Sequence, residues 1–120
     1  MQRRYMMQFF IYFSIKEGES MTPPSPENMA EMSKFMEESF KSGIIVSTGQ
    51  LPDKITHVSL KSGEISVTDG PFMEGKELIP GFTIIDVDTK EKAIEWTTKL
   101  RKCMGEGTLK MAPIFIPSMD

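Results

Sequence analysis

Met-Met-Gln-Phe-Phe-Ile-Tyr-Phe-Ser-Ile, residues 6–15, is the most informative stretch of the sequence. It is rich in aromatic and β-branched residues and contains neither Gly nor Pro, which is typical of a strand. Successive side chains of a strand point to opposite faces of its sheet, so Phe9 and Ile11 share one face while Phe10 and Tyr12 share the other. Both faces of that sheet are therefore apolar and need a cover.

Helical patterns follow the strand. Ser25-Pro26-Glu27 supplies an N-cap, a proline at the first helical position and a carboxylate near the positive end of the helix dipole. The apolar stripe of this helix consists of Met29, Met32, Met36 and Phe40, with Phe35 alongside. We interpret the methionines as core rather than as a copper site, because no Cys or His accompanies them. A second helix opens at residues 88–91, Asp-Thr-Lys-Glu, which resemble a capping box with Asp88 as the cap.

The remaining apolar stretches alternate as strands do. They are predicted at 44–48, in a hairpin over 56–68, at 81–87 and at 109–116. In the hairpin, Val58, Leu60, Ile65 and Val67 are expected to share one half-buried face. With the hairpin set aside, the order strand, helix, strand occurs twice, which predicts an α+β fold, the ferredoxin-like split βαβ sandwich with an extra central hairpin. Right-handed crossovers then place both helices on one face of the sheet.

The other face of the sheet has no predicted cover. It is expected to carry Phe10, Tyr12, Ile85, Val87 and Ile114, while Phe9, Ile11, Phe82 and Ile84 lie under the helices. Monomers rarely expose an apolar patch of more than a few hundred Å². We therefore infer a homodimer packed sheet against sheet, and the competing interpretation is that the hairpin folds back over this face.

Composition limits the class of protein. The chain has 120 residues and a formal net charge of −3, so we expect one domain over 1–120 with an ordered core at 6–116 and no nucleic-acid partner. No run approaches the ~20 apolar residues that span a bilayer, and no Ala-x-Ala site follows the first apolar run, so a cytoplasmic location and no membrane partner are expected. No metal-spaced His/Cys cluster, phosphate loop or dinucleotide fingerprint is present, which predicts no cofactor and no metal.

A family resemblance comes from a series of short motifs. Asp69-Gly70-Pro71-Phe72 is followed by Glu74, Lys76 and Glu77, then by Gly81-Phe82, Asp86-Val87 and Glu95-Trp96. In this order the chain resembles the YCII-related proteins of the DGPF type. The resemblance implies a dimeric α/β barrel related to muconolactone-isomerase-like proteins, mostly bacterial. Some relatives dechlorinate or rearrange intermediates of aromatic degradation, and some are encoded beside extracytoplasmic-function sigma factors.

Two departures from the family pattern limit what it implies. The wider family often carries a His-Asp pair toward the first helix, whereas this chain has no histidine before His57, so that dyad cannot operate here. Many relatives end with an arginine before a proline, where this chain has Ala112-Pro113. An anion-binding role carried by that arginine is therefore not expected.

Asp69 is the leading candidate for a general base, because Gly70 and Pro71 hold it at a sharp turn and positioning lowers the entropic part of a barrier. Its structural alternative is an Asx turn. His57 is the only histidine and the second catalytic candidate, with an ordinary strand residue as its alternative. The predicted substrate-binding residues are Gly70, Pro71, Phe72, Glu74, Lys76 and Glu77. Lys76 is suited to hold a carboxylate or phenolate, and a solvated charge run is the alternative reading of the loop.

The resulting hypothesis is a homodimer that binds a small polar or aromatic metabolite between sheet and helices. Cofactor-free isomerisation or elimination would use Asp69 as base, with Lys76 or His57 orienting the substrate. The alternative is a non-catalytic accessory module that binds a protein partner such as an extracytoplasmic-function sigma factor.

Overall fold

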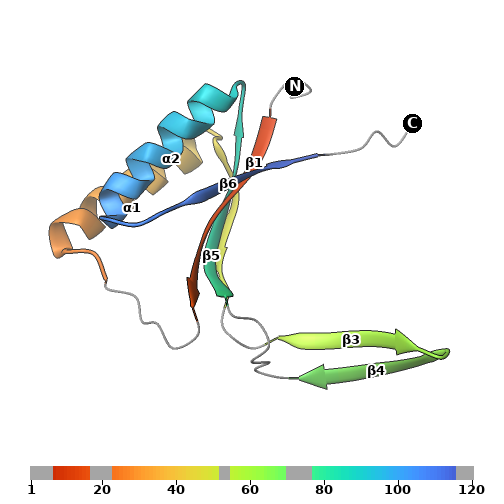
Figure 1. Ribbon diagram of the computed structural model, residues 1–120. Coiled ribbons are helices and arrows are strands. Elements are labelled where there is room, and N and C mark those ends of the chain that lie inside the picture. Colours follow the sequence, from red (N-terminus) through yellow and green to blue (C-terminus); the bar gives the residue numbers. More distant parts are fainter. Residues whose placement is uncertain (1–6, 17–22, 52–54, 70–76, 116–120) are drawn as a thin grey trace.

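The computed structural model describes residues 7–16, 23–51, 55–69 and 77–115. Within these ranges the chain forms two helices and six strands (Figure 1). In chain order they are β1 (Met7–Lys16), α1 (Pro26–Lys41), β2 (Ile45–Gln50), β3 (Thr56–Lys61), β4 (Glu64–Asp69), β5 (Glu77–Val87), α2 (Lys90–Met104) and β6 (Lys110–Ile114). Neither helix in the described part is long and apolar enough to cross a membrane.

Four strands form one antiparallel sheet in the order β2-β5-β1-β6, and β3 pairs only with β4. Without the hairpin this is the strand order of the ferredoxin-like split βαβ sandwich, so the predicted α+β fold is confirmed. Figure 1 shows α1 and α2 side by side on one face of the sheet, as right-handed crossovers require. The sheet of a single chain is open rather than closed into a barrel.

The core lies between this sheet and the helices. Its buried apolar residues are Phe9, Ile11, Ile45, Ile85, Val87, Ala93, Trp96 and Leu100. The prediction that Ile85 and Val87 face away from the helices was wrong, as was the placement of Phe82 and Ile84 beneath them. Phe9 pairs with Ile85 and Phe10 with Ile84, and paired residues share a face. Alternation divides the side chains of each strand between two faces. Only the register between neighbouring strands decides which of their side chains lie on the same face of the sheet.

The face away from the helices carries an aromatic cluster that we call the open face: Phe10, Tyr12, Phe82 and Ile84. The Phe10 ring lies 5.2 Å from that of Tyr12 and 5.6 Å from that of Phe82, measured between centroids. All four side chains are half-buried. None of the described elements covers this face, because β3 and β4 contact only each other.

The hairpin of β3 and β4 projects away from the sheet (Figure 1). Ser62 and Gly63 both have positive φ, 52° and 80°, which is the two-residue turn that matches the twist of paired strands. Val58, Leu60, Ile65 and Val67, the apolar hairpin face, are 63–68% exposed. The expectation of a half-buried face therefore fails for a single chain, and so does the interpretation that the hairpin folds back over the sheet.

β5 begins at Glu77, four residues before the predicted start at Gly81. Pro80 makes this region look like a loop, because proline cannot donate to a strand ladder. The register between β1 and β5 shifts between Phe13 and Ile15, and this irregularity accommodates Pro80 in an inner strand. Pro113 lies in β6 at the edge of the sheet, where proline is tolerated, as predicted.

Candidate functional site

Asp69 stands at the base of the hairpin. It is the last residue of β4 and pairs with Thr56, the first residue of β3. The Thr56 hydroxyl donates a hydrogen bond of 2.7 Å to Asp69 Oδ1. The carboxylate is exposed and is therefore accessible to a ligand. Its hydrogen bond with Thr56 fixes it to the neighbouring strand.

His57 does not converge with Asp69. It pairs with Thr68, one position along the ladder from the Thr56–Asp69 pair. Since consecutive side chains alternate between the faces of a hairpin, Asp69 lies on the face of Val58 and Val67, and His57 lies on the opposite face. The two side chains proposed for catalysis therefore cannot act on one substrate within a single hairpin.

The predicted substrate-binding residues lie in and beside the segment that joins β4 to β5. Five of them, Gly70, Pro71, Phe72, Glu74 and Lys76, lie outside the described residues. The sixth, Glu77, begins β5, where its backbone pairs with Lys16 of β1.

A cleft of about 170 Å³ lies between the sheet and the two helices. Its lining is almost entirely apolar and comes from four elements, β1, α1, β5 and α2, and from the segment before β6. The lining residues are Ile11, Tyr12, Phe13, Met32, Met36, Gly81, Phe82, Thr83, Leu100, Met104 and Leu109. Tyr12 and Phe82 border the cleft although their side chains alternate onto the open face. Thr83 Oγ1 is already hydrogen-bonded to Thr48 Oγ1 at 2.9 Å. Neither Asp69 nor His57 lines this cleft.

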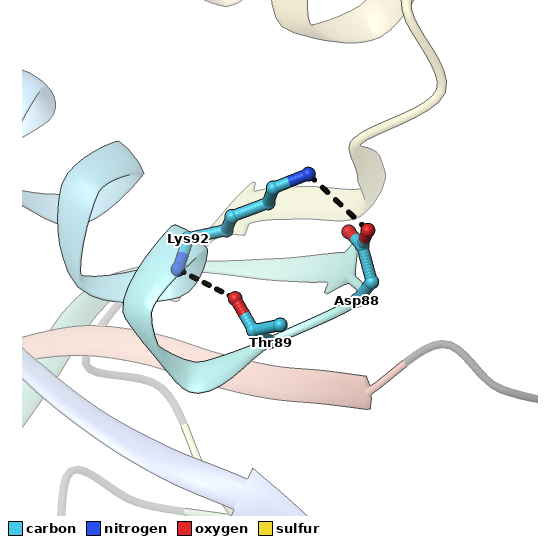
Figure 2. Close-up of polar contacts among 3 residues, drawn as sticks. All are labelled: Asp88, Thr89 and Lys92. Carbon is cyan, nitrogen blue, oxygen red and sulfur yellow. Dashed lines mark hydrogen bonds and ion pairs between the residues drawn. The ribbon is translucent and has the colours of Figure 1, made fainter.

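A second concavity, which we call the helix pocket, lies between α1, α2 and the end of β5, with a volume of about 490 Å³. Its lining includes Asp88 and Lys92 at the start of α2. There the Thr89 side chain accepts a hydrogen bond from the Lys92 backbone N–H at 3.1 Å (Figure 2). Thr89 is thus the N-cap of α2, and the prediction of Asp88 as the cap was wrong. Asp88 instead forms a 3.2 Å ion pair with Lys92 Nζ. Its hydrogen bond with Lys92 lowers the pKa of the Asp88 carboxyl from its ordinary value.

Cys103 has the character of an inert thiol. Burial raises the pKa of the Cys103 thiol, and the nearby Glu31 carboxylate adds to the effect. A raised pKa keeps the thiol protonated at neutral pH, and only the thiolate is a good nucleophile.

The sequence predicts a binding site between the sheet and the helices, where the cleft lies, but it does not predict the residues that line the cleft, nor the helix pocket. Met32 and Met36 were interpreted as core, and they do pack against it, but they also line the cleft. The dipeptides Asp86-Val87 and Glu95-Trp96 were noted only as part of a resemblance, yet all four residues line the helix pocket. Their convergence depends on how α2 lies against the end of β5, which no local pattern reveals.

Comparison with known proteins gives one family match. A model of the YCII-related domain family matches residues 7–114, the span from the start of β1 to the end of β6. No curated protein matches the chain. Among solved structures, the chain is similar to the periplasmic divalent cation tolerance protein CutA from Archaeoglobus fulgidus, with 17% identity and a TM-score of 0.38, over 93% of this chain and 86% of that chain. This likeness is too distant to indicate fold or function, and the ferredoxin-like fold follows from the strand order β2-β5-β1-β6 of the chain itself.

Proposed function

Since the chain belongs to the YCII-related domain family, we propose that it binds a small aromatic metabolite in the cleft between the sheet and the helices. The observation that carries this proposal is the apolar lining of a cleft of about 170 Å³. Apolar cavities of about 150 Å³ in other proteins take up benzene. The cleft thus has room for a single ring, and its apolar lining favours the aromatic over the polar metabolite among the two expected classes.

Methionine methyl groups provide the test, because Met32, Met36 and Met104 line the cleft. Fluorobenzene should shift the carbon-13 methyl resonances of these three residues saturably, and leave that of the exposed Met29 in place. Leu109→Phe should fill part of the cleft and weaken the response, whereas Leu51→Phe, at an exposed leucine outside the cleft, should not. Equal shifts at Met29 and at the cleft methionines, or no shift at all, would contradict the proposal.

For catalysis, we propose that Asp69 acts as a general base in a cofactor-free isomerisation or elimination. The support is an exposed carboxylate held by Thr56 at 2.7 Å. Because Asp69 does not line the cleft, the reacting atom would have to lie at the hairpin base. The remaining contacts to the substrate are those predicted for Gly70, Pro71, Phe72, Glu74, Lys76 and Glu77. His57 would have to come from the second subunit of a dimer, because it lies on the other face of its own hairpin.

Once a substrate is identified, Asp69→Asn separates the two roles. It keeps an acceptor for the Thr56 hydroxyl but removes the base, so turnover should fall by at least about 100-fold while fluorobenzene binding in the cleft stays unchanged. Unchanged turnover would show that Asp69 is structural.

We further propose that the working unit is a cytoplasmic homodimer of single-domain chains. A stable interface needs about 800 Å² per partner, and a fully exposed aromatic side chain supplies only ~150–250 Å². The three half-buried rings of the open face therefore cannot make such an interface alone. The apolar hairpin face, which is exposed on the same chain, would supply the additional interface area.

The second candidate function, an accessory module that binds a protein such as an extracytoplasmic-function sigma factor, is favoured by the same hairpin. A protein partner could cover Leu60 and Ile65, which are 68% and 63% exposed. Leu60→Lys should abolish capture of such a partner, whereas Ser59→Lys on the opposite face of the hairpin should not. A wild-type chain that is monomeric and captures a sigma factor stoichiometrically would favour this function over the dimer.

A further inference from the structure

The helix pocket offers a second site that shares no lining residue with the cleft. Its volume of about 490 Å³ falls within the range of ~300–1,000 Å³ that is typical of small-molecule sites. It is lined by the second half of α1, the end of β5 and the first two-thirds of α2. The lining residues are Phe35, Glu38, Ser39, Ser42, Ile44, Asp86, Val87, Asp88, Lys92, Glu95, Trp96 and Lys99.

The pocket has a rigid aromatic part. The rings of Phe35 and Trp96 lie 5.1 Å apart between centroids. The indole Nε1–H of Trp96 donates to Ser39 Oγ at 2.9 Å, and Ser39 Oγ in turn donates to the backbone oxygen of Phe35 at 2.8 Å. This chain of hydrogen bonds holds the indole in one orientation. Aromatic faces attract cations through their quadrupole, most strongly in the case of tryptophan.

The charges around these rings do not cancel. Lys92 and Asp88 neutralise each other in their 3.2 Å ion pair. In the described part of the chain, no hydrogen bond or ion pair engages the side chains of Glu38, Glu95 and Lys99. Two carboxylates against one ammonium leave a net charge of −1.

We propose that the helix pocket binds a small organic cation, an ammonium group on an apolar or aromatic body. The ammonium nitrogen binds the carboxylates of Glu38 and Glu95, and the apolar body packs against Phe35 and Trp96. Two dipeptides that lie apart in the sequence, Asp86-Val87 at the end of β5 and Glu95-Trp96 in α2, both line this pocket.

The probe is 2-phenylethylammonium, and the reporter is the fluorescence of Trp96, the only tryptophan of the chain. The cation should bind more tightly than the neutral 2-phenylethanol, and rising salt should narrow the difference. Glu38→Gln and Glu95→Gln should each weaken binding of the cation about two- to fivefold, as expected for exposed charges. Lys99→Gln should strengthen it by a similar factor.

Glu91→Gln is the matched control, because Glu91 lies on the first turn of α2, is exposed and does not line the pocket. It should change the affinity less than Glu95→Gln does. Equal affinities for the cation and the alcohol, equal effects of the two substitutions, or no change in Trp96 fluorescence would each overturn the proposal. The outcome is independent of the cleft, since fluorobenzene binding is read from methionine methyl groups and this site from the indole.

Discussion

One buried hydrogen bond joins the two helices through side chains alone. The Trp96 indole donates to Ser39 Oγ across the contact between α2 and α1, and the residues are 5% and 4% exposed. A buried N–H that loses its acceptor cannot form a hydrogen bond with water instead, so the free-energy cost of its desolvation is not compensated. Ser39 thus has a structural role in addition to lining the helix pocket.

The substitution Ser39→Ala should therefore lower the free energy of unfolding by about 1–3 kcal/mol. Alanine also raises helix propensity, by about 0.5 kcal/mol, which offsets part of the loss. Ser33→Ala on the exposed surface of α1 gives that gain alone, so the difference between the two variants in urea unfolding isolates the hydrogen bond. If Ser39→Ala and Ser33→Ala are equally stable, the hydrogen bond contributes nothing.

At the scale of an element, the stability of the first turn of α2 depends on pH. The pKa of Asp88 is lowered from its ordinary value of 3.8 by its hydrogen bond with Lys92 (Figure 2). A carboxyl whose pKa is lower in the folded state stabilises the fold above its unfolded pKa, and this contribution is lost as the pH falls through the folded value. The ion pair therefore supports α2 at neutral pH, and its contribution to stability begins to decline as the pH falls below the unfolded-state pKa, about 4.

Asp88→Asn tests this dependence. At pH 6 the variant should unfold at a lower urea concentration than the wild type, and the difference should shrink as the pH falls below about 4. Asp53→Asn, a change of the same charge outside the described residues, controls for net charge. A difference that persists unchanged at pH 3 would rule out the ion pair as its cause.

Local chemistry predicted these elements better than it predicted their partners. Ser25 is the N-cap of α1 and Pro26 its first residue, as expected, because capping depends only on neighbouring residues. Asp88 and Thr89 are both good caps and adjacent in sequence, so only the structure decides between them. The faces of β5 were assigned incorrectly because they depend on register with β1. The place of the cleft, between the sheet and the helices, follows from the predicted fold, but the lining of both concavities joins residues far apart in the chain, which the sequence alone did not reveal.

At the scale of the whole molecule, a single chain leaves two apolar surfaces uncovered, the open face and the apolar hairpin face. Burying the open face in a dimer makes a charge there costly on both subunits. We expect the wild type to sediment as a dimer at micromolar concentration and Tyr12→Glu to raise its dissociation constant at least about 100-fold, because an unpaired buried charge costs ~3–5 kcal/mol. The control is Ser33→Glu, a charge on the exposed surface of α1, which should leave the dimer intact. Circular dichroism checks that both variants fold. A wild-type monomer would refute the dimer directly, and a Tyr12→Glu variant that dimerises as tightly as the wild type would exclude the open face from the interface.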